Sequence, residues 1–88
     1  MSKKNLIRWT KYNHSILNGV LPGAEETSVF RRTISELSAN NISSMSIAAF
    51  DQDCYLVEYL EGYTKKSIKI LISEIETIKM KEVENVYP

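Results

Sequence analysis

Hydrophobic and polar side chains alternate most clearly over residues 42–62, where two apolar runs flank a short polar break. In the first run Met45 and Ile47 alternate with serine, and the break is the polar sequence of residues 51–53. A period of two is typical of a β-strand, and aspartates in a short break are typical of a turn. The pattern therefore predicts an antiparallel hairpin, around which the rest of the chain is organised.

Both faces of the second predicted strand carry apolar side chains. One face has Leu56, Glu58 and Leu60, and the other has Tyr55, Val57 and Tyr59. An antiparallel sheet with one face in water needs apolar residues on one face only. We therefore expect the Leu56 face to pack on the core, and the face with the two tyrosines to contact a second copy, another protein or a ligand.

A helical period follows the Pro22-Gly23 break and predicts a helix over residues 24–39. Its stripe recurs at helical spacing and consists of Val29, Phe30, Thr33, Ile34 and Leu37. Glutamates at positions 25 and 26 lie in the first turn, where negative charge suits the exposed amide groups. Asn40-Asn41 can adopt the left-handed conformation that ends a helix.

A second helical period predicts a helix over residues 64–78, beginning at the N-cap residue Thr64. Its stripe is the strongest periodicity in the chain and consists of Ile68, Leu71, Ile72, Ile75 and Ile78. Weaker alternations predict one strand over residues 5–12 and another over residues 81–88. Residues 14–21 fit two interpretations: an extension of the first strand, or a segment that covers an edge of the core.

The predicted order of strand, helix, hairpin, helix and strand is the βαββαβ order of the ferredoxin-like fold. This α+β fold has a four-stranded antiparallel sheet with two helices on one face. A chain of 88 residues is long enough for one such domain, so we expect a single ferredoxin-like domain over residues 1–88.

Composition narrows the classes of function. Eleven basic residues balance eleven acidic ones, so the chain lacks the positive field that holds nucleic acid or an anionic membrane. One cysteine and one histidine cannot form a zinc site within one chain. Charged residues interrupt the N-terminal region, and no stretch approaches the ~18 apolar residues of a membrane span. We expect a cytoplasmic protein with no metal, nucleic-acid or membrane partner.

Glu58 is the candidate for acid or base chemistry, because a carboxylate on a core-facing strand is a functional-site signal. The alternative is a basic partner that satisfies its charge. Candidate partners are Arg8, Arg31 and Lys11. His14 and Cys54 could act as a base and an accessible thiol, but ordinary structural positions explain both. No catalytic set is predicted.

Two short motifs lie at the start and at the end of the predicted hairpin. Asn40-Asn41 stands at the predicted helix end, and Glu58-Tyr59-Leu60-Glu61-Gly62 precedes the second predicted helix. Over residues 30–87 the chain resembles the BLUF family of flavin-binding blue-light sensor domains. In that family a Gln occupies the position of Glu58, and the spacing of the two motifs matches without a gap. The resemblance implies a flavin held near Asn40, Glu58 and Trp9.

The chain departs from the BLUF pattern at the residues that bind flavin. An ionised Glu58 has no N–H to donate where the family has an amide. Trp9 stands where the family has a Tyr, and residues 45–47 replace the family's Ile-Thr-Gly segment. We therefore expect no bound cofactor and predict a small, non-catalytic interaction or regulatory protein that forms a homodimer or binds another protein. The alternatives are a flavin-binding blue-light sensor and a cofactor-free enzyme that uses Glu58 as acid or base.

Overall fold

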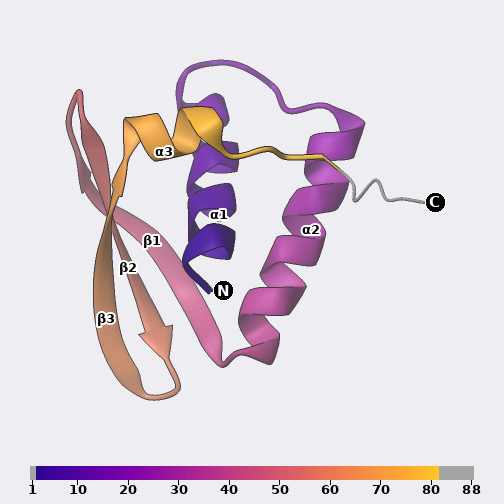
Figure 1. The fold of residues 1–88 in the computed structure, drawn as a ribbon. Helices are drawn as coiled ribbons and strands as arrows, with labels where there is room; N and C mark the ends of the chain where they lie inside the picture. Colours follow the sequence, from indigo (N-terminus) through magenta and orange to yellow (C-terminus); the bar gives the residue numbers. More distant parts are fainter. Residues whose placement is uncertain (1, 82–88) are drawn as a thin grey trace.

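The computed structural model describes residues 2–81, which form three helices and one three-stranded antiparallel sheet (Figure 1). The elements in chain order are α1 (Ser2–Leu17), α2 (Ala24–Ala39), β1 (Ile42–Phe50), β2 (Cys54–Glu61), β3 (Thr64–Leu71) and α3 (Ile72–Thr77). The strands pair in the order β1-β2-β3. The helices lie on one side of the sheet, which we call its inner face, and the opposite side is the outer face.

The predicted helix over residues 24–39 and the predicted hairpin are confirmed. Helix α2 has the expected bounds, and Asn41 after it has the left-handed φ of 63°. The carbonyl oxygen of Asn41 accepts a hydrogen bond of 2.8 Å from the amide of Gly62. In the turn between β1 and β2, the Asp51 carboxylate accepts the amides of Asp53 and Cys54 at 2.8 and 3.0 Å. Local capping and turn chemistry therefore hold both elements, as the sequence indicated.

The predicted strand over residues 5–12 is wrong, because these residues lie within α1. Two of the buried residues of α1 are polar: the Thr10 hydroxyl donates to the Leu6 carbonyl at 2.8 Å, and the Asn5 amide donates to Glu36 Oε1 at 3.1 Å. Polar residues at buried positions interrupt the apolar stripe by which a helix is normally predicted. The helix continues to Leu17, so residues 14–17 extend α1.

The predicted helix over residues 64–78 is wrong over most of its length, because residues 64–71 form β3. A tight turn at Gly62-Tyr63 joins β2 to β3, and Glu61 pairs with Thr64 across it. Gly62 has a φ of 63°, which glycine adopts without steric cost at the first central position of a hairpin turn. The helical spacing of the isoleucines arises because a strand and a six-residue helix follow one another directly.

The ferredoxin-like prediction is contradicted. The fold is α+β, but residues 2–81 form a sheet of three consecutive antiparallel strands where four were expected, and three helices where two were expected. A meander of neighbouring strands contains no β–α–β crossover, which the ferredoxin-like order requires twice. The predicted last strand begins at Lys81, and residues 82–88 lie outside the described residues.

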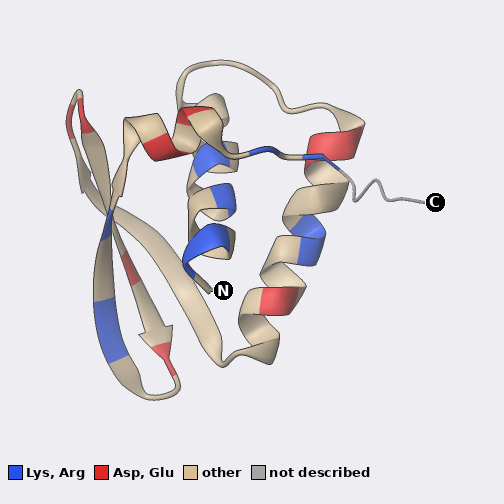
Figure 2. Cartoon of the chain, in the orientation of Figure 1, with Lys and Arg blue, Asp and Glu red and all other residues tan. Residues whose placement is uncertain are grey.

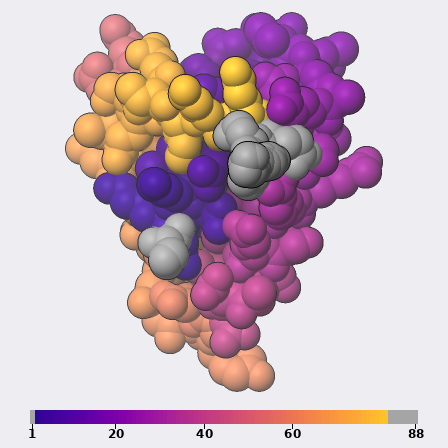
Figure 3. All heavy atoms as spheres, turned by 45° about the vertical axis from the view of Figure 1, so that its right-hand side comes forward, coloured from indigo at the N-terminus to yellow at the C-terminus, as the bar shows by residue number. Residues whose placement is uncertain are grey.

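The hydrophobic core lies between the inner face and the three helices. Its buried members are Leu6, Ile7, Trp9, Leu37, Ile42, Tyr55, Val57, Ile70 and Ile75. Figure 3 shows α1 bordered by α3 above and by α2 to its right, so neighbours cover α1 from several directions. The stacked rings of Tyr12 and Phe30, with centroids 3.9 Å apart, join α1 to α2.

Basic residues of α1 hold the short helix α3 against it. The Lys11 ammonium donates to the carbonyl oxygens of Ile75 and Ile78 at 3.0 and 2.8 Å, at the C-terminal end of α3. A cation suits this position because the last carbonyls of a helix have no partner within the helix. Lys3 forms an ion pair of 3.2 Å with Glu74 at the other end of α3. In Figure 2 the Lys and Arg positions of α1 are the blue bands along that helix.

Candidate interaction surface

The outer face combines leucines with charged side chains. Strand alternation and register place on it Ser43, Ser46 and Ala49 of β1, Cys54, Leu56, Glu58 and Leu60 of β2, and Lys65, Ser67, Lys69 and Leu71 of β3. Leu56 and Leu71 are 38% and 43% exposed, and Leu60 is half-buried. Leucines that remain in water on a sheet are candidates for contact with another protein.

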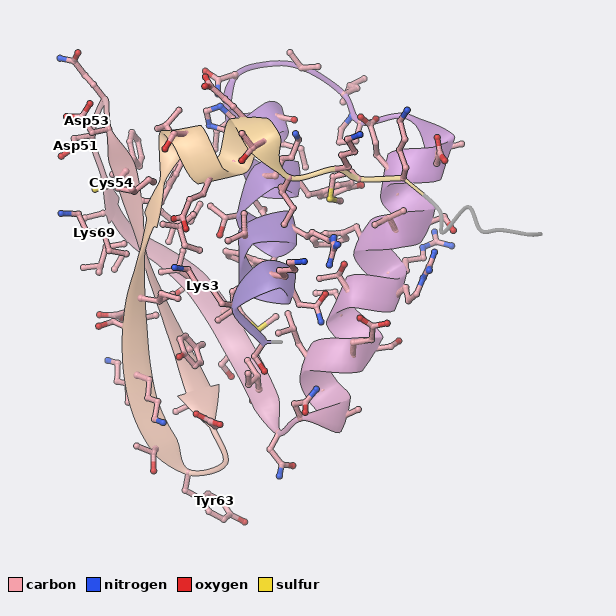
Figure 4. The ribbon with its side chains drawn as sticks, in the orientation of Figure 1. Lys3, Asp51, Asp53, Cys54, Tyr63 and Lys69 are labelled. Atoms are coloured by element: carbon pink, nitrogen blue, oxygen red, sulfur yellow. The ribbon has the colours of Figure 1, made fainter. Side chains whose placement is uncertain are left out.

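The charges of the outer face have neighbours within the chain. Lys65 Nζ lies 3.7 Å from Glu58 Oε1, with both side chains substantially exposed. The amides of Asp53 and Cys54 hold the pKa of Asp51 below its usual value, and the charge of Lys69 adds to this effect. Figure 4 shows Lys69 and Cys54 at the margin of the sheet away from the helices, on the side of Asp51. On the outer face Glu58 therefore lies between the two leucines of β2, and lysines of β3 lie beside them.

Both edges of the sheet are blunted against pairing with another strand. The register of β1 is broken between Ser43 and Ser46 and again between Ile47 and Ala49, and Ser44 has a φ of 56°. Such bulges twist an edge strand away from a regular ladder. The β3 edge carries lysines at positions 65, 66 and 69, which repel a second cationic strand. Neither edge of the described sheet therefore offers a regular ladder to an added strand.

The structure corrects the prediction of which face of β2 is exposed to solvent. Tyr55 and Val57 are 4% and 0% exposed and lie in the core, and Tyr59 packs partly buried against the same cluster. The face expected on the core, with Leu56 and Leu60, is the one in solvent. Lys65 and Lys69 of β3 explain the difference, because they pair across the ladder with Leu60 and Leu56 and hold that face in water.

The three residues expected around a flavin do not converge on one site. Trp9 is 9% exposed and belongs to the core of the helical side. Asn40 caps the end of α2, and its side-chain amide donates to the Glu36 carbonyl at 2.9 Å. Glu58 lies on the outer face, so the sheet separates its side chain from Trp9.

Glu58 has a different basic neighbour from those expected. The basic residue beside Glu58 is Lys65, and the Glu58 side chain is 38% exposed. Lys11 instead binds the carbonyls at the end of α3. Arg8 donates to the Asn5 side chain at 3.2 Å and to the Lys79 carbonyl at 3.4 Å. A half-exposed, ion-paired carboxylate does not have the desolvated setting typical of an acid or base catalyst.

A contact between His14 and Tyr55 ties the end of α1 to β2. His14 Nδ1 lies 2.6 Å from the Tyr55 hydroxyl oxygen, and the two rings meet edge to face with centroids 5.5 Å apart. The Asn18 amide donates to the His14 carbonyl at 2.8 Å. A neutral imidazole with its proton on Nε2 accepts the phenol hydrogen, so the buried hydroxyl has a partner. Sequence alone gave no signal for this contact, because the residues lie 41 positions apart.

Burial raises the pKa of Tyr55 above its ordinary value of 10.0. The unfolded chain releases this proton near pH 10 while the folded chain retains it, so the free energy of unfolding is expected to fall as the pH rises above about 10. Tyr55→Phe should show a shallower fall in urea denaturation measured from pH 8 to 11. Tyr63→Phe is the matched control, because Tyr63 is fully exposed at the β2–β3 turn. Equal slopes for the two variants would contradict the assignment.

One cavity, of about 610 Å³, lies between the start of α2 and the chain after α3. Its charged lining residues are Lys11, Glu25, Glu26, Glu76, Lys79 and Lys81. The Lys11 ammonium is already bound to two carbonyl oxygens, and neither histidine nor cysteine lines the cavity. Across residues 2–81, no group of three or more His, Cys, Asp or Glu side chains is placed to hold a metal ion. The described residues that line this cavity therefore include no nucleophile paired with a base.

Comparison with known proteins gives no relative: no family model, no curated protein and no solved structure matches this chain. No helix in the described part of the chain combines the length and apolar character needed to cross a membrane.

Proposed function

We propose that this chain is a small non-catalytic interaction protein that forms a homodimer through the outer face. The observation that carries the proposal is the row of Leu56 and Leu60 on the central strand, in solvent, while both edges of the sheet are blunted. Apolar side chains on an open sheet face are stabilised when a second apolar face removes them from water. The outer face carries both signs of charge, so a second copy offers a partner for each.

The size of the outer face sets the expected strength of association. Three strands spaced about 4.8 Å apart, each about eight residues long at about 3.3 Å per residue, cover roughly 14 by 26 Å. A typical stable interface buries about 800 Å² on each partner, which is more than a flat patch of this size supplies. We therefore expect a reversible dimer whose population rises with protein concentration.

Sedimentation equilibrium between about 5 µM and 1 mM tests the proposal. The average mass should rise from 10.1 kDa towards twice that value, 20.2 kDa. Cys54 is the single cysteine and lies on the outer face, so its alkylation rate should fall over the same range. A mass that stays at 10.1 kDa throughout, with an alkylation rate independent of concentration, would overturn the proposal.

A further inference from the structure

Opposite charges lie on a diagonal of the outer face. In the β2–β3 register Glu58 is opposite Ser67, and Leu56 is opposite Lys69. These four residues form a rectangle in which Glu58 and Lys69 occupy one diagonal and Leu56 and Ser67 the other. Diagonal neighbours on adjacent strands are about 7–8 Å apart, so the charges of Glu58 and Lys69 are well separated on the surface of one chain.

The symmetry of a homodimer limits how this rectangle can meet its copy. A two-fold axis makes the same patch contact itself, and for two facing sheets the axis lies in the plane between them. An axis along β2 would place Glu58 against the partner's Glu58. An axis across the strands at Leu56 would place Lys69 against the partner's Lys69. Both arrangements bring like charges together and are disfavoured.

An axis along the Leu56–Ser67 diagonal brings opposite charges together. It places Glu58 over the partner's Lys69 twice, once on each side of the axis, and leaves Leu56 beside the partner's Leu56. Neighbouring strands lie about 4.8 Å apart, and residues two positions apart on one strand lie about 6.8 Å apart. With this axis, the strands of one sheet therefore cross the strands of the partner's sheet at about 70°. That angle falls in the near-orthogonal class of sheet packing.

We infer that the dimer packs its two outer faces in this crossed arrangement, with Glu58 of each copy paired to the partner's Lys69 and Leu56 at the centre. The inference rests on the proposed function, since it specifies how the homodimer is built. Both charged side chains lie in solvent in the single chain, so their substitution leaves the core intact.

The test exchanges the charges and measures the dissociation constant by sedimentation. E58K and K69E should each raise the dissociation constant of the homodimer at least tenfold, because like charges then meet twice. An equimolar mixture of the two variants should form a heterodimer close to the wild-type affinity, because each charge then meets its opposite. The double variant E58K/K69E should likewise recover. K65Q removes the neighbour of Glu58 within the chain and should stay within about threefold of the wild type.

The outcomes separate this inference from the proposed function. A wild-type dimer whose single variants do not recover on mixing would overturn the crossed arrangement and leave the homodimer standing. A wild-type chain that remains a monomer to about 1 mM would overturn both. Recovery in the mixture cannot come from a pair within one chain, because each chain there carries two like charges at positions 58 and 69.

Discussion

Leu56→Asp is expected to leave the protein monomeric at concentrations where the wild-type chain is a dimer. Leu56 lies on the outer face of the central strand and is 38% exposed in the single chain. In the proposed dimer an aspartate here would be buried close to the partner's aspartate, and the nearest cation, Lys69 opposite it in the ladder, is already paired with the partner's Glu58. An unpaired carboxylate at the centre of an interface costs several kcal/mol, so we expect the dissociation constant to rise at least 100-fold. Sedimentation equilibrium measures this directly.

Leu21→Asp is the matched control for this prediction. Leu21 is 88% exposed in the segment between α1 and α2, away from the outer face. The same change of residue type there should leave the dissociation constant within about twofold of the wild type. Circular dichroism should show that both variants keep the fold, since neither leucine belongs to the buried core. Leu56→Asp protein that sediments like the wild type would rule out the outer face as the interface.

Leu37→Ala is expected to have the largest effect on stability. Leu37 is 0% exposed on α2 and belongs to the core cluster with Trp9 and Ile42. Truncating a fully buried leucine leaves a cavity and costs about 2–5 kcal/mol. A domain of this length has about 4–13 kcal/mol in total, so the variant should be partly unfolded at 37 °C. Urea denaturation at low protein concentration measures the loss without a contribution from dimerisation.

Leu17→Ala provides the comparison for the core variant. Leu17 is 58% exposed in the last turn of α1, so the same truncation removes little buried surface. Its free energy of unfolding should lie within about 0.5 kcal/mol of the wild type. Equal losses in Leu37→Ala and Leu17→Ala would show that the packing of α2 on the sheet is not as described.

Helix α2 and the β1–β2 hairpin could be predicted because their signals are local. The stripe of α2 is complete, acidic residues begin it and Asn41 ends it. Helix α1 could not be predicted because α2, α3 and the core residues of the sheet pack on it from different directions, which spreads its buried positions around the helix. Its buried Asn5 and Thr10 are tolerated only because each donates a hydrogen bond, and sequence does not show those bonds.

The predicted helix after Gly62 is wrong because two interpretations fit the same pattern of apolar residues. Ile68, Leu71, Ile72 and Ile75 are spaced as on one helix, and they also suit a strand followed by a short helix. The signal that separates them is Gly62-Tyr63, a two-residue hairpin turn with glycine first. Strand-favouring residues in β3, such as Ile68 and Ile70, alternate with polar ones and support the same interpretation.

Apolar side chains on both faces of β2 follow from the sequence alone, since alternation along a strand needs no knowledge of its neighbours. Which of these faces the helices cover depends on the tertiary structure. The two faces of an isolated strand are equivalent until cross-strand partners are known. In the folded chain Tyr55 and Val57 lie beside Ile70 and Ile68, whereas Leu56 and Leu60 lie beside Lys69 and Lys65. Burying the lysines would cost more than exposing the two leucines, so the helices pack on the isoleucine side and the leucines remain available to a partner.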